Sequence, residues 1–191
     1  MRKGILFIVS APSGCGKTTL CSELLRRMPE LCRSVSFTTR PPRRGEHNRN
    51  DYYFVSVKEF NSLLKKGKFI EHAKVFGNLY GTPMGPIKQA LVKGKDTLLS
   101  IDVKGAMQIK KLFGPRCVCI FILPPSFATL KQRLTKRHAD SRAEIKKRLK
   151  IAKKELSYLP RYNYAVVNNK LKEALHQLKA IIIAERNKII L

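Results

Sequence analysis

The run Ala-Pro-Ser-Gly-Cys-Gly-Lys-Thr at positions 11–18 has the residue types and spacing of a phosphate-binding loop. It matches the template Gly-x-x-x-x-Gly-Lys-Ser/Thr, with Ala11 in place of the first glycine, and it lies between an apolar run and a segment with helical spacing of leucines. In such a loop, backbone N–H groups and the helix N-terminus hold phosphate oxygens. The predicted ligands of ATP are Ala11, Pro12, Ser13, Gly14, Cys15, Gly16, Lys17 and Thr18.

Residues of this loop have separate expected tasks. Gly14 and Gly16 let the backbone curl closely around an anion. Lys17 reaches the β- and γ-phosphates, and the Thr18 hydroxyl joins the Mg²⁺ shell, which makes Mg²⁺ the predicted cofactor and Thr18 its protein ligand. The alternative, a fortuitous glycine-rich bend, is disfavoured by the strand and helix expected on either side. The loop alone does not identify the phosphoryl acceptor.

Length and charge favour one basic globular domain. The 191 residues, 43% of them hydrophobic, suffice for one buried core but are few for two independent domains. The 39 Lys and Arg against 13 Asp and Glu give a formal charge of +26, which suits a polyanionic partner. We expect a basic surface with nucleotide sites; the charge permits nucleic-acid binding, but not as the main function. The oligomeric state is not indicated.

The cysteines and apolar runs predict a cytoplasmic protein. The five cysteines lack paired spacing, so reduced thiols are expected rather than disulfides or a zinc site. The apolar run near the N-terminus is too short for a secretory signal, and no run reaches the length of a membrane span. No membrane partner is therefore expected.

Strands alternating with helices predict an α/β fold: a three-layer P-loop NTPase fold with a central, mainly parallel sheet. Between residues 35 and 82 short strands follow one another, which predicts a small β-rich insert. The expected strands are 5–10, 35–39, 52–55, 69–76, 79–81, 97–102, 117–123 and 165–167. The expected helices are 16–27, 56–66, 82–94, 103–113, 126–136, 141–156 and 171–188, with Ser56, Thr82, Ser126 and Ser141 as N-caps.

Motifs in and around the insert bear on the acceptor. They are Ser-Phe-Thr-Thr-Arg-Pro-Pro-Arg from Ser36, Gly-Glu-x4-Asp-Tyr-Tyr-Phe-Val from Gly45, Phe-Ile-Glu-His-Ala from Phe69, Gly-Asn-Leu-Tyr-Gly-Thr from Gly77 and Ile-Asp-Val-Lys-Gly from Ile101. With the phosphate loop, and in this order and spacing, they resemble the guanylate kinase family over essentially the whole chain. The resemblance implies ATP-dependent, Mg²⁺-assisted phosphorylation of GMP to GDP in purine nucleotide metabolism.

The resemblance also implies roles for single residues. Glu71 matches the carboxylate that accepts guanine N1–H and the 2-amino group, donors that adenine lacks there. Ser36 and Thr82 match hydroxyls near guanine, and Asp102 belongs to the same GMP site. The residues matching those that hold the GMP phosphate are Arg40, Arg43, Tyr52 and Tyr80. Taken singly, these arginines, Glu71 and the tyrosines also suit solvated loop, polar-face and core positions.

The basic stretch near residues 131–154 matches the family's lid. Catalytic roles are implied for Lys17, Arg133, Arg137 and Arg148, and Asn168 matches a position near adenine. The implied division is core 1–34, 83–125 and 158–191, GMP-binding insert 35–82 and lid 126–157. The chain departs from the family at Ser100, usually Asp, and at Lys136 and His138, usually Gly.

Two other functions remain compatible with these residues. One is a P-loop kinase of another small phosphorylated acceptor. The other is a non-catalytic module on the same scaffold that grips nucleic acid with its basic stretch. The intact Lys17 and Thr18 favour an enzyme.

Overall fold

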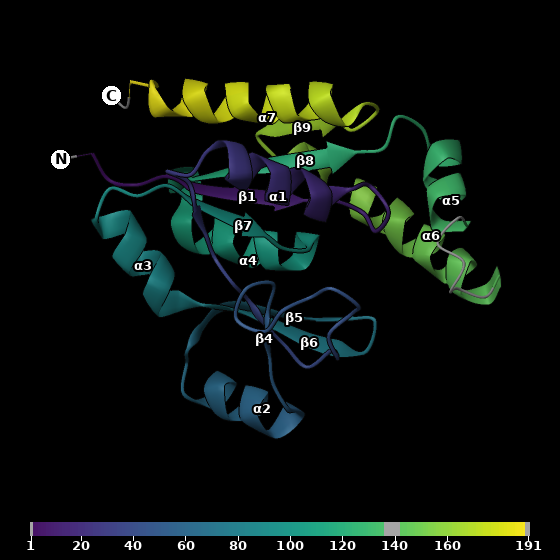
Figure 1. The fold of residues 1–191 in the computed structure, drawn as a ribbon, viewed down its shortest axis with the longest axis horizontal. Coiled ribbons are helices and arrows are strands. Elements are labelled where there is room, and N and C mark those ends of the chain that lie inside the picture. The colour runs from purple at the N-terminus through teal and green to yellow at the C-terminus, as the bar shows by residue number, and fades with distance from the viewer. Residues whose placement is uncertain (1, 136–141, 190–191) are drawn as a thin grey trace.

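The computed structural model describes residues 2–135 and 142–189 and contains a parallel sheet with helices on both faces and a smaller sheet beside it (Figure 1). In the parallel sheet the strands lie in the order β2-β7-β1-β8-β9. They are β1 (Leu6–Ser10), β2 (Cys32–Arg33), β7 (Thr97–Ser100), β8 (Cys117–Leu123) and β9 (Tyr164–Val167). Every residue of β1 is buried, as expected of a central parallel strand covered on both faces.

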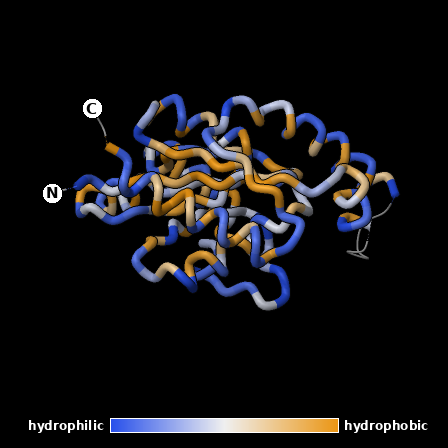
Figure 2. Tube along the Cα trace, turned by 90° about the horizontal axis from the view of Figure 1, so that it is seen from above, coloured by the Kyte–Doolittle hydropathy of each residue, from blue (hydrophilic) through white to orange (hydrophobic). Residues whose placement is uncertain are grey.

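The helices that cover the parallel sheet are α1 (Lys17–Arg27), α3 (Met84–Val92), α4 (Val103–Phe113) and α7 (Leu171–Arg186). Alternate residues of β1 face opposite layers: Phe7 and Val9 pack in the cluster with α1 and α7, and Leu6 and Ile8 in the cluster with α3 and α4. Figure 2 shows the hydrophobic strands enclosed between helices of mixed hydropathy. This is the three-layer α/β architecture that the sequence predicts.

The smaller sheet has the order β4-β3-β6-β5 and carries α2 (Val57–Lys65) on its outer side (Figure 1). Its strands are β3 (Phe37–Thr38), β4 (Tyr53–Phe54), β5 (Phe69–Val75) and β6 (Asn78–Pro83). Aromatic rings hold it together, because Phe69 stacks on Phe60 of α2 with ring centroids 4.7 Å apart and contacts Phe37 of β3 edge-on. The predicted N-cap of α2 is confirmed: the Ser56 hydroxyl accepts the N–H of Glu59.

The helices α5 (Phe127–Thr135) and α6 (Arg142–Leu156) extend beyond the carboxyl ends of the parallel strands (Figure 1). Ser126 caps α5 as predicted, since its hydroxyl accepts the N–H of Thr129. Short 3₁₀ turns, η1 (Gly114–Arg116) and η2 (Leu159–Arg161), precede β8 and β9. The predicted cap Ser141 and the departures Lys136 and His138 lie outside the described residues.

One carboxylate links the two ends of the described chain. Asp96 accepts hydrogen bonds from the Arg2 and Arg186 guanidinium groups, at 2.8 Å and 2.7 Å, and from the backbone N–H of Ile5. These hydrogen bonds lower the pKa of Asp96 although its burial opposes the shift.

None of the helices within the described residues has the length and apolarity needed to cross a bilayer.

Two local predictions were wrong, and one short strand was missed. Thr82 does not cap α3, because β6 continues through it to Pro83, which occupies the cap position. The expected strands 69–76 and 79–81 leave Gly77 and Asn78 for the turn between them, but the β5–β6 turn is formed by Phe76 and Gly77, both at positive φ, since Val75 pairs with Asn78. Strand β2 was not predicted; its two residues pair with β7 only at the edge of the sheet.

Candidate active site

The phosphate loop joins the buried end of β1 to the first turn of α1. Gly14 and Gly16 have φ values of +93° and +82°, which glycine adopts without strain. A Cβ on Gly16 would also lie 2.5 Å from Nδ2 of Asn168, so this position requires glycine for space as well. Among the described residues no side chain caps α1, which leaves its first N–H groups available to an anion.

Asn168, just after β9, supports the loop from behind. It is 7% exposed, its Nδ2 donates to the carbonyl of Cys15 at 2.8 Å, and its own carbonyl accepts from Nη2 of Arg133 at 3.0 Å. Burial raises the pKa of the Cys15 thiol to about 12, so this cysteine is a neutral packing residue. The expected proximity of Asn168 to adenine stays a prediction.

Lys17 connects the loop to the neighbouring strand. Its Nζ donates to the carbonyl of Ile101, which follows β7, at 2.6 Å. Burial lowers the pKa of Lys17, and the carboxylates of Asp102 and Glu71 oppose that shift. Thr18, one residue on, is exposed, and it and Lys17 line one cavity.

A chain of polar groups links three strands of the smaller sheet. Glu71 on β5 pairs with Thr82 on β6, and the Thr82 hydroxyl donates to Oε1 of Glu71 at 2.5 Å. The hydroxyls of Thr82 and Ser36, the latter just before β3, are 3.0 Å apart. Glu71 is 4% exposed, and this burial raises its pKa to about 7, assisted by the charge of Asp102 and opposed by the Thr82 hydrogen bond. The three predicted guanine contacts are thus adjacent.

The loop between β3 and β4 carries Arg40 and Arg43, which line the same cavity as Lys17 and Thr18. Nη2 of Arg40 lies 2.9 Å from both carboxylate oxygens of Glu46, and the Arg43 N–H donates to the same carboxylate at 2.7 Å. The Arg40 guanidinium lies 5.6 Å from the ring centroid of Tyr52, whose ring contacts Tyr80 edge-on. The predicted phosphate ligands therefore form one cluster.

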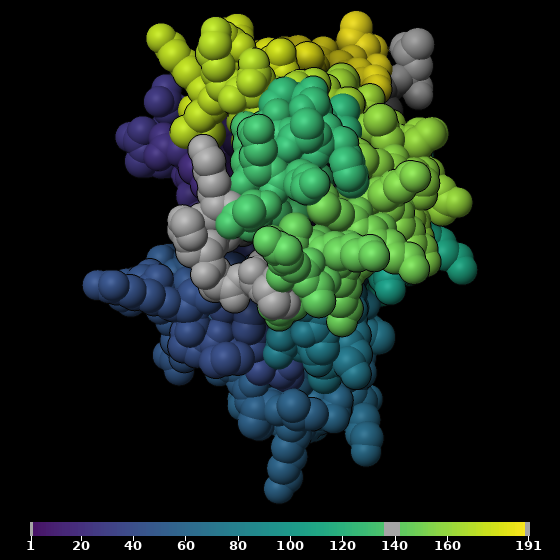
Figure 3. Space-filling view, turned by 90° about the vertical axis from the view of Figure 1, so that its right-hand side faces the viewer, coloured from purple at the N-terminus to yellow at the C-terminus, as the bar shows by residue number. Residues whose placement is uncertain are grey.

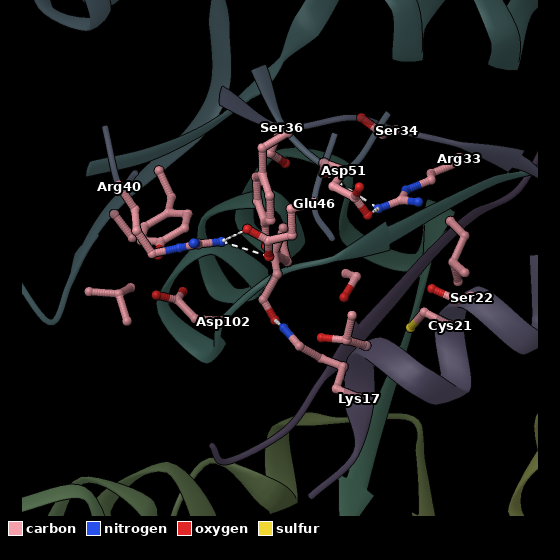
Figure 4. A pocket seen from close by; sticks show the side chains of 18 of the residues that line it. Lys17, Cys21, Ser22, Arg33, Ser34, Ser36, Arg40, Glu46, Asp51 and Asp102 are labelled. Atoms are coloured by element: carbon pink, nitrogen blue, oxygen red, sulfur yellow. Dashed lines mark hydrogen bonds and ion pairs between the residues drawn. The ribbon is translucent and has the colours of Figure 1, made fainter. Parts of the chain in front are cut away.

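The start of α1, the arginine cluster and Glu71 surround a cavity of about 660 Å³, a size suited to nucleotides, whereas the predicted ATP ligands Ala11 to Gly16 and Asn168 do not line it. Figure 4 shows Lys17 pointing into it from α1, with the Arg40–Glu46 pair to one side and the Arg33–Asp51 pair to the other. Thr82 is fully buried and does not line the cavity, but it bonds to Glu71 and Ser36, which do. The predicted residues that line it are Lys17, Thr18, Ser36, Arg40, Arg43, Tyr52, Glu71, Tyr80, Asp102 and Arg148.

Arg148 of α6 reaches both halves of the site. Its Nη1 donates to the Ser13 hydroxyl at 3.3 Å, and its Cζ lies 5.1 Å from the ring centroid of Phe76 in the β5–β6 turn. In the space-filling view, residues of α6 (light green) lie directly above the blue residues that include the smaller sheet, and α5 (darker green) lies above α6 (Figure 3). Arg133 bonds to the carbonyl of Asn168, and the predicted Arg137 lies outside the described residues.

The sequence did not predict the residues of the site that form ion pairs with one another. Glu46 stands in a quoted motif, but nothing local indicates that it pairs with Arg40. Arg33 and Asp51 line the cavity as an ion pair whose members are 18 residues apart. Within the described residues no group of three or more His, Cys, Asp or Glu side chains is arranged to hold a metal.

A central strand that ends in a Gly-Lys-Thr phosphate loop, beside a cavity with an arginine cluster and a buried carboxylate, defines a P-loop kinase of a small phosphorylated molecule. The family model described as guanylate kinase matches residues 3–185.

Known proteins similar to this chain carry the same name. The guanylate kinase of Clostridium tetani is 46% identical over 189 residues, with 99% of this chain and 90% of the relative covered. That of Geobacter metallireducens is 45% identical over 185 residues, with 97% and 91% covered. The crystal structure of guanylate kinase from Anaplasma phagocytophilum matches with a TM-score of 0.83 at 36% identity and covers 98% of this chain and 89% of that one. The chain belongs to the guanylate kinase family and is a nucleoside monophosphate kinase, a phosphotransferase.

Proposed function

We propose that the chain transfers the γ-phosphoryl group of ATP to the phosphate of GMP, with ADP and GDP as products, inside the cavity described above. Membership of the guanylate kinase family supports this reaction. The observation that carries the assignment to this site is Glu71, a buried carboxylate in the same cavity as Lys17 of the phosphate loop.

Glu71 is the proposed reader of guanine. Guanine presents N1–H and a 2-amino group side by side, and an ionised carboxylate accepts both. The Thr82 hydroxyl already donates to Oε1, which orients the carboxylate. The Ser36 hydroxyl, which then donates to the Thr82 oxygen, is proposed to turn and donate to guanine O6 when the nucleotide binds. Adenine has no donor at these two positions and would leave a buried charge unpaired, which disfavours AMP strongly.

The arginine cluster is the proposed site of the GMP phosphate. Arg40 and Arg43 present planar guanidinium groups that match phosphate oxygens, and Tyr52 and Tyr80 add hydroxyl donors. Glu46 holds Arg40 in place before the nucleotide binds, so little side-chain freedom is lost on binding.

The phosphate loop is the proposed site of the ATP phosphates. Its backbone N–H groups hold the oxygens, and Lys17 exchanges the Ile101 carbonyl for a phosphate oxygen. The Thr18 hydroxyl and the Asp102 carboxylate line the same cavity and offer the oxygen ligands that Mg²⁺ prefers, so these residues fit the metal. Held by these residues, Mg²⁺ would neutralise part of the charge on the ATP phosphates.

Transfer needs alignment and charge neutralisation rather than a general base. An oxygen of the GMP phosphate, already anionic, forms the new bond to the γ-phosphorus as the bond to the bridging β–γ oxygen breaks, and ADP leaves with that electron pair. Arg148, which bonds to the loop at Ser13, together with Arg133 and Arg137, is proposed to stabilise the charge on the transferring group.

The proposed organisation follows these roles: a core of residues 1–34, 83–125 and 158–191, a GMP-binding insert of 35–82 and a lid of 126–157. The separate sheet formed by β3 to β6 supports the insert. We also propose a cytoplasmic location, which the five free cysteines support.

The test is a coupled assay of ADP release with GMP, AMP, CMP and UMP in turn. GMP is expected to be turned over well and the other three poorly. Glu71→Gln is expected to reduce kcat/KM for GMP by about 100-fold or more, since it replaces one acceptor by a donor, with ATP affinity unchanged. Equal turnover of AMP and GMP by the unmodified chain would rule out the guanine assignment.

A further inference from the structure

Gly105, in the first turn of α4, packs against the carboxylate of Glu71. It is buried, and a Cβ built on it would overlap Oε2 of Glu71 and lie 2.9 Å from Cδ. Its φ is not in the left-handed region, so an alanine could adopt the same backbone conformation. This position therefore requires glycine for space alone, and the space is taken by the acceptor of guanine.

The α4 side of this contact is held in place. The Gly105 N–H donates to Oδ1 of Asp102, the N-cap of α4, at 2.7 Å. Ala106 and Ile109, on the same helix, are fully buried in a cluster with Ile70 of β5. The first turn of α4 cannot rotate away without breaking its cap and this packing.

The strand side is held by a paired hydrogen bond. Nε2 of Gln108 donates to the carbonyl of His72 at 2.8 Å, and Oε1 of Gln108 accepts the His72 N–H at 3.2 Å. Gln108 lies on α4, and His72 is the neighbour of Glu71 on β5. The residues on either side of Glu71 are thus held against α4, His72 by its backbone hydrogen bonds and Ile70 by side-chain packing, so an added methyl group at position 105 must displace the Glu71 side chain.

We infer that Gly105 is a positioning residue that sets the depth of the Glu71 carboxylate and thereby the selectivity for guanine over related purines. This inference rests on the proposed function of Glu71. Thr82 holds one carboxylate oxygen and Gly105 limits the position of the other. Two parallel hydrogen bonds to guanine need both oxygens in one plane, so a displacement of about 1 Å weakens the pair.

The experiment compares GMP with IMP, which keeps N1–H but lacks the 2-amino group. Gly105→Ala is expected to raise KM for GMP by about 10-fold or more, to leave KM for ATP unchanged and to lower the ratio of kcat/KM for GMP over IMP. If Gly105 had a purely structural role, the substitution would change kcat/KM for GMP and for IMP by the same factor. The matched control is Gly85→Ala on α3, where a Cβ meets nothing within 4 Å, and this variant is expected to keep the unmodified KM values and ratio.

A second variant tests the contact directly. Glu71→Asp withdraws the carboxylate by about one methylene, roughly 1.5 Å, which makes room for the alanine methyl group. The double variant Gly105→Ala with Glu71→Asp is expected to lose less kcat/KM for GMP than the product of the two single losses. If Gly105→Ala alone does not fold, the double variant is still expected to fold and to turn over GMP, because the shorter side chain at position 71 removes the overlap with the alanine methyl group.

Three results would overturn the inference: an unchanged GMP over IMP ratio in Gly105→Ala, losses in the double variant that multiply, or a double variant that does not fold. Each of these is read with an unmodified chain that phosphorylates GMP. Failure of the unmodified chain to use GMP would instead overturn the proposed function, so the two failures are distinguishable.

Discussion

Replacement of Glu71 by Gln is expected to stabilise the free protein at neutral pH while it abolishes efficient GMP use. Glu71 is 4% exposed, and in the absence of a nucleotide its Oε1 accepts a hydrogen bond from the Thr82 hydroxyl. An ionised carboxylate in that position is poorly solvated, whereas the isosteric amide carries no charge. The free energy of unfolding therefore depends on pH differently in the unmodified chain and in Glu71→Gln.

The size of this pH-dependent change in the free energy of unfolding follows from the pKa of Glu71. Burial raises the pKa of Glu71 from its ordinary 4.5 to about 7, so between these values the folded chain holds a proton that the unfolded chain has released. Stability contributed by the protonated group is complete below pH 4.5, falls as the pH rises, and is lost above pH 7. The total loss is about 3 kcal/mol, and the Gln variant does not suffer it.

The assay is urea unfolding of both proteins at pH 5 and pH 8, without nucleotide. The free energy of unfolding of Glu71→Gln minus that of the unmodified chain is expected to be larger at pH 8 by about 2 to 3 kcal/mol. Glu59→Gln is the control, because Glu59 is exposed on α2 and its replacement leaves the buried carboxylate intact. A pH-independent difference between Glu71→Gln and the unmodified chain would refute the reasoning.

Three further outcomes are expected from the site. KM for GMP falls as the pH rises from 6 to 8, because only the ionised Glu71 accepts both guanine donors, and steady-state kinetics with saturating ATP measures this; a flat profile would contradict it. Asn168→Ala removes the hydrogen bond to the Cys15 carbonyl and raises KM for ATP by about 10-fold with KM for GMP unchanged, whereas parallel changes would point to general loosening. Lys17→Met lowers kcat by about 100-fold or more, while calorimetry still detects GMP binding of unmodified affinity.

The phosphate loop and the order of strands and helices were predictable from local patterns. Buried parallel strands such as β1 and β8 are continuous apolar runs, and the loop has fixed residue types because its backbone must surround an anion. Ser56 and Ser126 cap their helices as predicted because capping depends only on residues three apart.

Features that depend on distant partners were not predictable in this way. Thr82 followed by a proline has the local pattern of an N-cap, but its hydroxyl donates to Glu71 across the hairpin, and this tertiary contact prevails. Gly105 and Gln108 act on β5 only because α4 packs across it, 34 to 36 residues away along the chain. No single-sequence pattern encodes which helix lies behind a given carboxylate.

The Asp96 link between Arg2 and Arg186 has a consequence for the order of events during synthesis. The phosphate loop is synthesised well before α7, the helix that covers part of the face of β1 formed by Phe7 and Val9. Arg186 also supplies one of the bonds that satisfy Asp96. A nascent chain therefore has its nucleotide-binding segment long before it has a nucleotide-binding site.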